Sequence, residues 1–431
     1  MSGLFHWKQD HSITSMKFLF LIIALGSFIY LLFKVYQKSE GGLRPYFHYG
    51  LTYKLMAGVL FGSVYIYGYR EGDTLLFFNE ASRLFEIFYY DPFKYLKVIS
   101  DSSIVGIPDR RTAFFINFIS IINLFSFNNY WVLTAYLSVI SFISLWLLIQ
   151  RIVRSYRVHP LAALVGFIFF PSLTFWTSGL IKETVSISAM SLIILQVIPL
   201  LKGKKVTFTG SVVGISALLV LTQLKYYHAA ALIIVLVPLV FWKILMGWIK
   251  DTRLRWVSFA SVVLITILTT STLHYNLDTS RVSKIIVENN KATADISDPE
   301  KIIRYYDLEP TLGSLLINVP IALFNGLFKP LPWDSWNWMS FLGSMENLML
   351  LMLVAHSLYY KGGQLINQKE EVYALIIYIV IMTIALALST PNYGTLSRYK
   401  VAFLPFLLLM VFNNLLQVKS IKRFVRIDRG S

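Results

Sequence analysis

The sequence predicts an all-α fold, that of a polytopic transmembrane helical protein, from three observations. Hydrophobic residues make up 56% of the 431 positions and charged residues only 14%, whereas soluble domains carry about 25% charged residues. Apolar runs long enough to cross a bilayer recur from Met16 to Val418. The net charge of +16 gathers in short connections between these runs, which is typical of membrane topology, so we expect no nucleic-acid partner.

The apolar runs predict about eleven spans, because about 20 residues are needed to cross the hydrocarbon core. The runs begin near Phe18, Leu51, Tyr130, Leu161, Val185, Val206, Ala229, Val257, Phe341, Val372 and Val401. Two more runs, Ala113 to Phe127 and Leu315 to Phe328, are shorter. We expect these two to form interfacial or re-entrant helices on the outer face, within one integral domain that covers residues 1–431.

The distribution of Lys and Arg predicts the orientation of the chain, because cytoplasmic connections are enriched in both. The basic connections contain Arg151, Arg154 and Arg157; Lys202, Lys204 and Lys205; Lys243, Lys250, Arg253 and Arg255; and, after the last run, Lys419, Lys422, Arg423, Arg426 and Arg429. With these residues in the cytoplasm, the N-terminus lies outside the inner (plasma) membrane and the C-terminus is cytoplasmic. Two long segments, residues 70–129 and 275–340, then face outwards.

The first outer segment opens with Arg70-Glu71-Gly72-Asp73-Thr74, of which Arg70 is a candidate substrate contact. A carboxylate at the water–lipid boundary can deprotonate an acceptor hydroxyl, which makes Asp73 the candidate catalytic base and Glu71 a second candidate. The alternative is structural, because Asp before a helix is a common N-cap and Glu71 can pair with Arg70. The residues that follow, Thr74 to Phe88, have the pattern of an amphipathic helix that lies flat on the membrane.

Lys182 and Glu183 follow the helix-breaking residues Pro171 and Gly179 and open an apolar run. Ionisable groups within a span are costly, and they are usually paired or functional. Lys182 is therefore a candidate phosphate contact, and Glu183 is a candidate substrate-binding residue beside it. In the structural alternative, the Lys182 amine reaches the interface and Glu183 is stabilised by the positive end of the helix dipole.

Arg398 and Lys400 form a second pair of candidate residues, in a short outer loop that leads into the last run. The planar guanidinium of Arg398 suits a phosphate or a pyrophosphate, and Lys400 is expected to support it. The alternative is that both residues anchor the chain to lipid headgroups.

A fourth group comprises Lys329, Trp333 and Asp334, near the end of the second outer segment, and Glu346 in the next run. Trp333 is expected either in an interfacial aromatic belt or stacked on a sugar ring. Asp334 is a weaker candidate than Asp73 for the functional acid. Glu346 needs a partner inside a span, and Lys329 and Lys182 are the available cations.

Other kinds of chemistry are not indicated. Cysteine is absent, which excludes thiol catalysis, and the sequence contains no histidine metal motif, phosphate loop, dinucleotide fingerprint or serine nucleophile elbow. We therefore predict no metal site and leave the cofactor unknown. Outer acids such as Asp295, Asp298 and Glu300 are compatible with a divalent cation, which the sequence does not require. His228, beside Lys225 in a short outer turn, fits a structural role.

The arrangement of these features resembles the GT-C superfamily of integral-membrane glycosyltransferases and the related Wzy/EpsG-type polysaccharide polymerases. Gly72-Asp73 stands just beyond a span, and the catalytic acid of the family matches Asp73 best. A glycine separates Glu71 from Asp73, whereas protein mannosyltransferases carry adjacent acids. Lys182-Glu183 stands where EpsG-like relatives often have Arg-Gln. The resemblance implies that a polyprenyl-phosphate or polyprenyl-diphosphate sugar reacts on the outer face.

In the leading hypothesis, the protein moves one sugar from such a lipid carrier to a glycan, lipid or protein acceptor. Asp73 takes the acceptor proton, while Lys182, Arg398 and Lys400 hold the departing phosphate. The runner-up is a Wzy-type polymerase of O-antigen or capsular polysaccharide. A flippase or transporter of lipid-linked sugars is a weaker alternative, because the sequence lacks the two matching halves common in transporters. A non-catalytic scaffold is the remaining alternative.

Overall fold

The computed structural model is helical throughout the part of the chain that it describes, which comprises residues 25–40, 42–101, 107, 109–272, 274–278, 280–335, 337–359 and 369–417. These residues form no strand, and their one isolated antiparallel bridge joins Ile302 to Asn392. Two compact units result. The first takes the described residues of Met1–Ile143 together with Ser178–Ile181, and the second takes Ser144–Thr177 and the described residues from Lys182 onwards.

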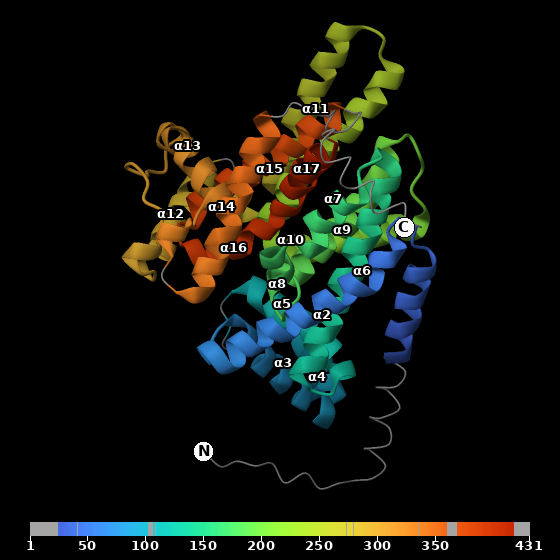
Figure 1. Ribbon diagram of the computed structural model, residues 1–431, viewed down its shortest axis with the longest axis vertical. Coiled ribbons are helices and arrows are strands. Elements are labelled where there is room, and N and C mark those ends of the chain that lie inside the picture. The colour runs from blue at the N-terminus through green and yellow to red at the C-terminus, as the bar shows by residue number, and fades with distance from the viewer. Residues whose placement is uncertain are drawn as a thin grey trace, which may run out of the picture. The chain divides into compact units, whose positions relative to one another are not determined.

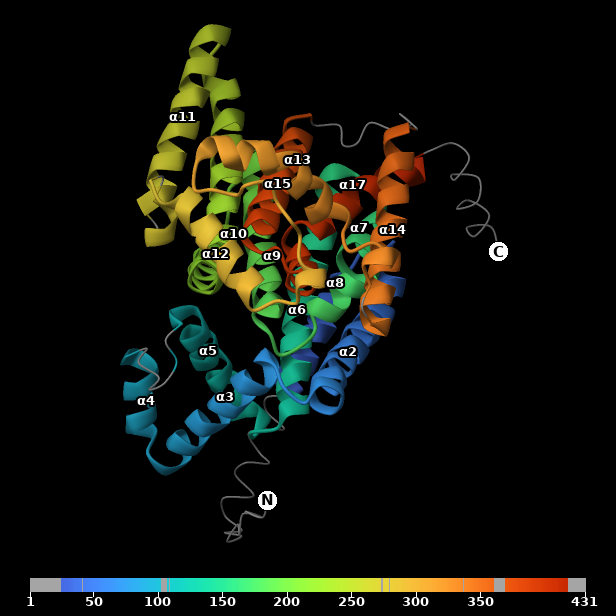
Figure 2. The ribbon, with the colours of Figure 1, turned by 90° about the vertical axis from the view of Figure 1, so that its left-hand side faces the viewer.

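The first unit begins with a helical stretch over residues 25–37. Its further helices are α2 (Phe47–Ser63), which continues as a π-helical segment (Val64–Tyr69), α3 (Asp73–Tyr90), α4 (Pro92–Asp101), α5 (Arg110–Ser126) and the beginning of α6 (Tyr130–Tyr156). Figure 2 shows α3, α4 and α5 in blue to teal, with α3 packed on both of the others. The first outer segment predicted from the sequence is therefore a small helical assembly.

Helix α3 has the amphipathic pattern that the sequence predicts, and it extends the expected range by a residue or two at each end. Thr74, Phe77, Ala81 and Leu84 are buried, at the three- and four-residue spacing of one helical face. Phe77 packs edge-on against Phe115 of α5, with ring centroids 4.9 Å apart. Part of the apolar face of α3 therefore packs against protein.

The turn before α3 depends on backbone conformations that favour glycine. Gly72 has φ 124° and is the N-cap of the helix, while Asp73 is its first residue. Arg70, at the end of the π-helical segment, is left-handed with φ 60°. The interpretation of Asp73 as an N-cap is therefore wrong, because glycine takes that position and leaves the carboxylate exposed.

The second unit contains the rest of α6 and all the later helices (Figure 1). These are α7 (Pro160–Leu164), a π-helical segment (Val165–Phe169), α8 (Pro171–Trp176), α9 (Lys182–Leu201), α10 (Phe208–Trp248), α11 (Thr252–Thr272), α12 (Val282–Asp295), α13 (Leu312–Phe328), α14 (Trp338–Tyr359), α15 (Lys369–Ser389), α16 (Tyr393–Tyr399) and α17 (Leu404–Gln417). Short 3₁₀ turns lie at Arg44–Tyr46 in the first unit and at Tyr275–Leu277, Pro299–Lys301, Pro332–Asp334 and Lys400–Ala402 in the second. In both ribbon views α10 and α11 run side by side.

Six helices of the described chain are long and apolar enough to cross a membrane, namely α6, α9, α10, α11, α14 and α15. A seventh candidate is the pair Tyr393–Ala402 and Leu404–Leu416, which is bent by 67°. The chain is thus a helical membrane protein, but the prediction of eleven spans is not confirmed. The run near Phe18 begins outside the described residues, and the basic residues after α17 also lie outside them.

The difference from eleven has local causes. The run near Leu161 gives a helical stretch of only ten residues, Pro160–Phe169, because Phe170 precedes Pro171 and adopts an extended conformation. The runs near Val206 and Ala229 join into α10, which has a non-helical residue at Lys225 (φ −146°, ψ 75°). The run near Leu51 gives α2, which continues through the π-helical segment to Tyr69 and is not among the helices that qualify as spans.

The short helix α13 packs closely on α15 in the second unit. A Cβ atom added to Gly326 would lie 2.6 Å from Cγ2 and 3.0 Å from the carbonyl oxygen of Thr383, so only glycine allows this approach. Nearby, a buried apolar cluster joins α8, α13, α14 and the start of α17. Its members are Phe170, Leu173, Phe328, Leu350, Val401, Leu404 and Leu408. This packing fixes Val401, the residue that follows Lys400.

Candidate functional site

The second unit contains a buried ion cluster that consists of Glu183, Lys225 and Arg398. The Nζ atom of Lys225 lies 2.7 Å from Oε1 of Glu183, and Nε of Arg398 lies 3.2 Å from the same oxygen. The side chains of Glu183 and Lys225 are only 2% and 4% exposed, whereas that of Arg398 is 19% exposed. One carboxylate therefore faces two cations, and Arg398 is the member that solvent reaches best.

The break in α10 brings Lys225 to this position. The residue departs from helical geometry in the middle of an apolar helix, and its ammonium group donates a hydrogen bond to Glu183 in the first turn of α9. The same ammonium lies 4.0 Å from the ring centroid of Tyr399, which adds a cation–π contact. The cluster thus joins α9, α10 and α16, and among its three members the cations outnumber the acid by one.

Glu183 and Arg398 are sequence candidates that the structure brings together, whereas Lys225 was assigned no role beyond its place in a short turn. One local signal for Lys225 exists: it is the only charged residue between Phe208 and Trp242, in an apolar stretch where an unpaired charge would be costly. Lys182, next to Glu183, opens α9 with a partly buried side chain.

Lys400 is buried and binds protein groups. Its ammonium donates hydrogen bonds to the carbonyl oxygens of Leu327 and Lys329, at 3.1 and 2.8 Å, and to Oδ1 of Asn347, at 3.1 Å. Asn347 in turn donates to the carbonyl oxygen of Pro330. These bonds fasten the 327–334 turn, which carries three further candidates, onto α14.

The 327–334 turn contains an ion pair. Nζ of Lys329 lies 3.0 Å from Oδ1 of Asp334, whose other oxygen accepts the backbone N–H of Leu331. Burial lowers the pKa of Lys329, but its contacts with Asp334 and Tyr393 outweigh burial, so the pKa is raised overall. Trp333 in the same turn is 72% exposed, so its ring is available to lipid or sugar.

Glu346 of α14 has a partner other than the cations expected from the sequence. Its Oε2 atom accepts the backbone N–H of Ser172 at 3.1 Å, near the N-terminus of α8. Lys400 attracts its charge from a greater distance. An ion pair between Glu346 and Lys329 or Lys182 is not present in the structure. Glu346 therefore links α14 to α8 beside the apolar cluster.

The segment before α13 holds the loop that leads to Arg398. The side chains of Asn290 and Tyr305 donate hydrogen bonds, at 2.6 and 2.7 Å, to the carbonyl oxygens of Leu388 and Ala387 at the end of α15. Asn392 bonds Ser297 at 3.0 Å. Since the last carbonyl groups of a helix lack intrahelical partners, these side chains stabilise the end of α15 and the start of α16.

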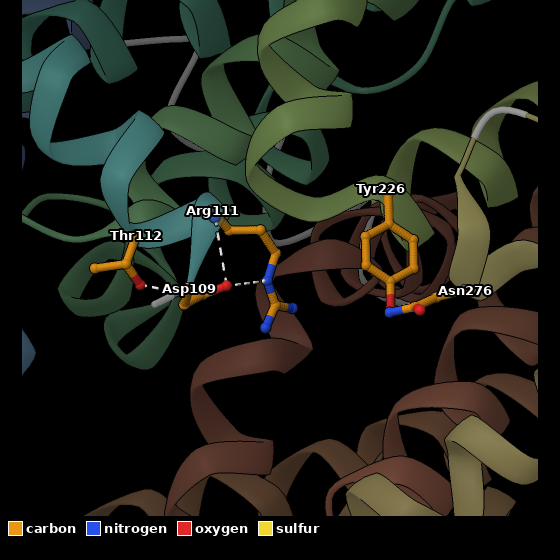
Figure 3. Close-up of polar contacts among 5 residues, drawn as sticks. All are labelled: Asp109, Arg111, Thr112, Tyr226 and Asn276. Carbon is orange, nitrogen blue, oxygen red and sulfur yellow. Dashed lines mark hydrogen bonds and ion pairs between the residues drawn. The ribbon is translucent and has the colours of Figure 1, made fainter. Parts of the chain in front are cut away.

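A buried imidazole lies one turn beyond Lys225 on α10. His228 is fully buried, and neither of its ring nitrogens has a hydrogen-bond partner among the described residues. Nearby on the same helix, Tyr226 stacks on His274 with ring centroids 3.9 Å apart. Its hydroxyl accepts a hydrogen bond from the Asn276 side chain at 3.1 Å, as the right-hand part of Figure 3 shows.

In the first unit, Arg70, Glu71 and Asp73 are all exposed. No ion pair joins Arg70 to Glu71 in the structure, so the expected pairing of these neighbours is not observed. Another acid of this segment, Asp109, caps α5 by accepting hydrogen bonds from Arg111 and Thr112 (Figure 3). Asp73 is thus an accessible carboxylate in the first turn of α3.

Within the described residues, no group of His, Asp and Glu side chains is arranged to hold a metal ion. Comparison with protein-family models, curated proteins and solved structures finds no match to the chain.

Proposed function

We propose that the protein is a membrane glycosyltransferase of GT-C-like type. It moves a sugar from a polyprenyl-phosphate or polyprenyl-diphosphate donor to a glycan, lipid or protein acceptor on the outer face of the membrane. The observation that carries this proposal is the buried ion cluster, in which two cations face one acid. Two cations beside one acid at the start of an apolar helix suit the phosphate of a lipid carrier.

Arg398 is the proposed phosphate contact. Its guanidinium is a planar, permanently charged fork that matches phosphate oxygens, and it is the most exposed member of the cluster. Lys225 adds a second positive charge beside Arg398. Lys182, at the start of α9, adds a further positive charge for the phosphate. Lys400 acts indirectly, because it holds the turn that presents Trp333.

Asp73 is the proposed general base. Its exposed carboxylate takes the proton of the acceptor hydroxyl while that oxygen bonds the anomeric carbon, and the phosphate leaves with the electrons of the broken bond. Glu71 is the alternative base in the same turn. No cofactor is assigned to the reaction.

The membrane setting forms part of the proposal. Six apolar helices support a multi-pass protein, and we place it in the inner (plasma) membrane with eleven spans, the N-terminus outside and the C-terminus in the cytoplasm. The basic connections at residues 151–157, 202–205 and 243–255 favour this orientation.

Purified protein in liposomes with a radiolabelled polyprenyl-phosphate sugar and a mixture of candidate acceptors tests the proposal. We expect label transfer, with Arg398→Gln reducing the rate about 100-fold or more and Asp73→Asn about 100- to 10,000-fold. Arg83→Gln and Glu86→Gln, exposed positions on α3, serve as matched controls and are expected to retain activity.

The outcomes separate the alternatives. Ladders of products with a lipid-linked oligosaccharide would favour the polymerase. Movement of the lipid across the bilayer without sugar transfer would instead indicate a flippase. Full activity in Asp73→Asn would exclude Asp73 as the base.

A further inference from the structure

The ring of Tyr399 lies against both cations of the buried ion cluster. The ammonium nitrogen of Lys225 is 4.0 Å from the centroid of this ring, and the central guanidinium carbon of Arg398 is 5.3 Å from the same centroid. Both distances are within the reach of a cation–π contact, about 6 Å. Tyr399 is the last residue of α16 and is partly buried. One aromatic ring therefore contacts the two groups to which the proposed function assigns the donor phosphate.

The position of the ring opposes a repulsion within the cluster. Nitrogen atoms of Lys225 and Arg398 lie 2.7 and 3.2 Å from the same carboxylate oxygen of Glu183, so the two positive charges are close together and repel each other. The side chain of Lys225 is only 4% exposed, and water therefore weakens this repulsion little. The face of an aromatic ring is partially negative and attracts cations. The Tyr399 ring thus stabilises both cations beside their shared acid.

We propose that Tyr399 is a positioning residue of the donor site, which holds Lys225 and Arg398 in place for the donor phosphate. This inference rests on the proposed function, because it requires the phosphate to bind at the ion cluster. The ring acts through the cations and needs no contact with the donor. A site whose cations are already in place binds an anion more tightly than a site that must order them first.

A purely structural role for Tyr399 has different consequences. In that role the ring only helps to pack α16 on α10, so a substitution lowers the stability of the protein and leaves the donor affinity of the folded molecule unchanged. A positioning role weakens the binding of a lipid that carries a phosphate, and the loss follows the electron density of the ring. The dependence of donor affinity on ring electron density is therefore the decisive measurement.

The experiment replaces Tyr399 by phenylalanine with zero, one, two or three fluorine atoms, in the full-length protein in nanodiscs. Fluorine withdraws electrons from the ring face and changes its size little, so the series weakens the cation–π contact in steps. The affinity for polyprenyl-phosphate-glucose is measured by displacement of a fluorescent polyprenyl phosphate. We expect Tyr399→Phe to remain within about twofold of the wild type. The dissociation constant should then rise with each fluorine, by about 3- to 30-fold in total.

Three controls accompany this series. Tyr399→Leu removes the aromatic face and should weaken binding at least as much as the most fluorinated ring. Polyprenol of the same chain length, which lacks the phosphate, should bind all the variants equally. The same fluorinated series at Phe167, a buried ring of the second unit that packs edge-on against Phe406, is the matched control and should leave the dissociation constant of the donor unchanged.

The results distinguish this inference from the proposed function. A stepwise loss of affinity that is confined to Tyr399 and to the phosphate-bearing lipid supports the positioning role. If the dissociation constant stays the same along the Tyr399 series, whatever the change in the midpoint of thermal unfolding, the positioning role is wrong while the function stands. An equal rise in the Phe167 series would also contradict it. If the wild type does not bind polyprenyl-phosphate-glucose, the proposed function is overturned, and the inference with it.

Discussion

At the scale of single residues, the turn before α3 depends on Gly72. A side chain there would have to adopt φ 124°, and its Cβ would lie 2.9 Å from the ring of Tyr65. We expect Gly72→Ala to lower the free energy of unfolding by about 1–3 kcal/mol, seen as a lower midpoint of thermal unfolding in detergent.

Gly68→Ala, four residues earlier, is the control for this prediction. An added Cβ at Gly68 meets no atom within 4 Å, and the residue does not have a positive φ. Its unfolding midpoint should remain near that of the wild type. Equal effects of the two substitutions would contradict the special role of Gly72.

The raised pKa of Lys329 gives a second prediction at this scale. An amine with a raised pKa stays protonated to higher pH, and only the neutral amine reacts with acylating reagents. The ion pair with Asp334 contributes to this rise, so Asp334→Asn should shift half-modification of Lys329 to lower pH. Mass spectrometry after brief acylation at pH 9 to 11 measures the shift.

The exposed Lys284 of α12, which pairs with Glu288, provides the internal reference for the acylation experiment. Its modification should be the same in the wild type and in Asp334→Asn. An unchanged profile for Lys329 in Asp334→Asn would show that Asp334 does not hold its proton. The raised pKa of Lys329 also stabilises the folded protein. This contribution to the free energy of unfolding is complete below the pKa of Lys in the unfolded chain, and it is lost as pH rises through the raised pKa of the folded state.

At the scale of helices, the contact between α13 and α15 depends on Gly326. Ala at this position places Cβ against the Thr383 side chain and carbonyl. We therefore expect Gly326→Ala to lower the free energy of unfolding by about 1–3 kcal/mol. Gly313→Ala in the same helix is the matched control, because nothing lies within 4 Å of its added Cβ. There the better helix propensity of Ala should add up to about 1 kcal/mol.

Opposite signs for the two substitutions in α13 are the expected result in thermal unfolding. A loss of stability at both positions would indicate that the helix tolerates no added volume on any face. A gain at both would mean that α13 and α15 do not approach as closely as the structure shows.

The helices themselves could largely be predicted from hydrophobic runs, since α6, α9, α11, α14 and α15 begin within a few residues of the expected positions. The end of the stretch before Phe170 also has a sequence cause, namely Pro171. The union of two runs in α10 was not predictable, because hydropathy does not reveal whether a charged residue such as Lys225 lies in a loop or at a break within a helix.

The candidate site was predictable only in part. Glu183 and Arg398 stood out as charges near apolar runs, but their contact with each other and with Lys225 depends on how α9, α10 and α16 pack. A single sequence carries no local signal for such long-range pairing. The hydrogen bonds through which Lys400 holds the 327–334 turn could not be predicted for the same reason.

At the scale of the whole molecule, the absence of cysteine allows the orientation of the chain in the membrane to be measured with introduced cysteines, because no native thiol reacts with the label. We expect Lys291→Cys, on exposed α12, to react with a membrane-impermeant maleimide in intact cells. Lys204→Cys, in the exposed connection between α9 and α10, should react only after the membrane is permeabilised. The reverse pattern would invert the proposed topology, and labelling of both positions in intact cells would contradict it.

The shared carboxylate of the ion cluster also constrains how the protein can evolve. Loss of Lys225 leaves Glu183 paired with Arg398, whereas loss of Glu183 first leaves the buried Lys225 and the partly buried Arg398 without their common partner. The order in which substitutions occur at this site therefore affects the stability of the intermediates. A lineage that abandons the cluster is expected to lose a cation before it loses the acid, so intermediates with the acid and a single cation should outnumber those with two cations alone.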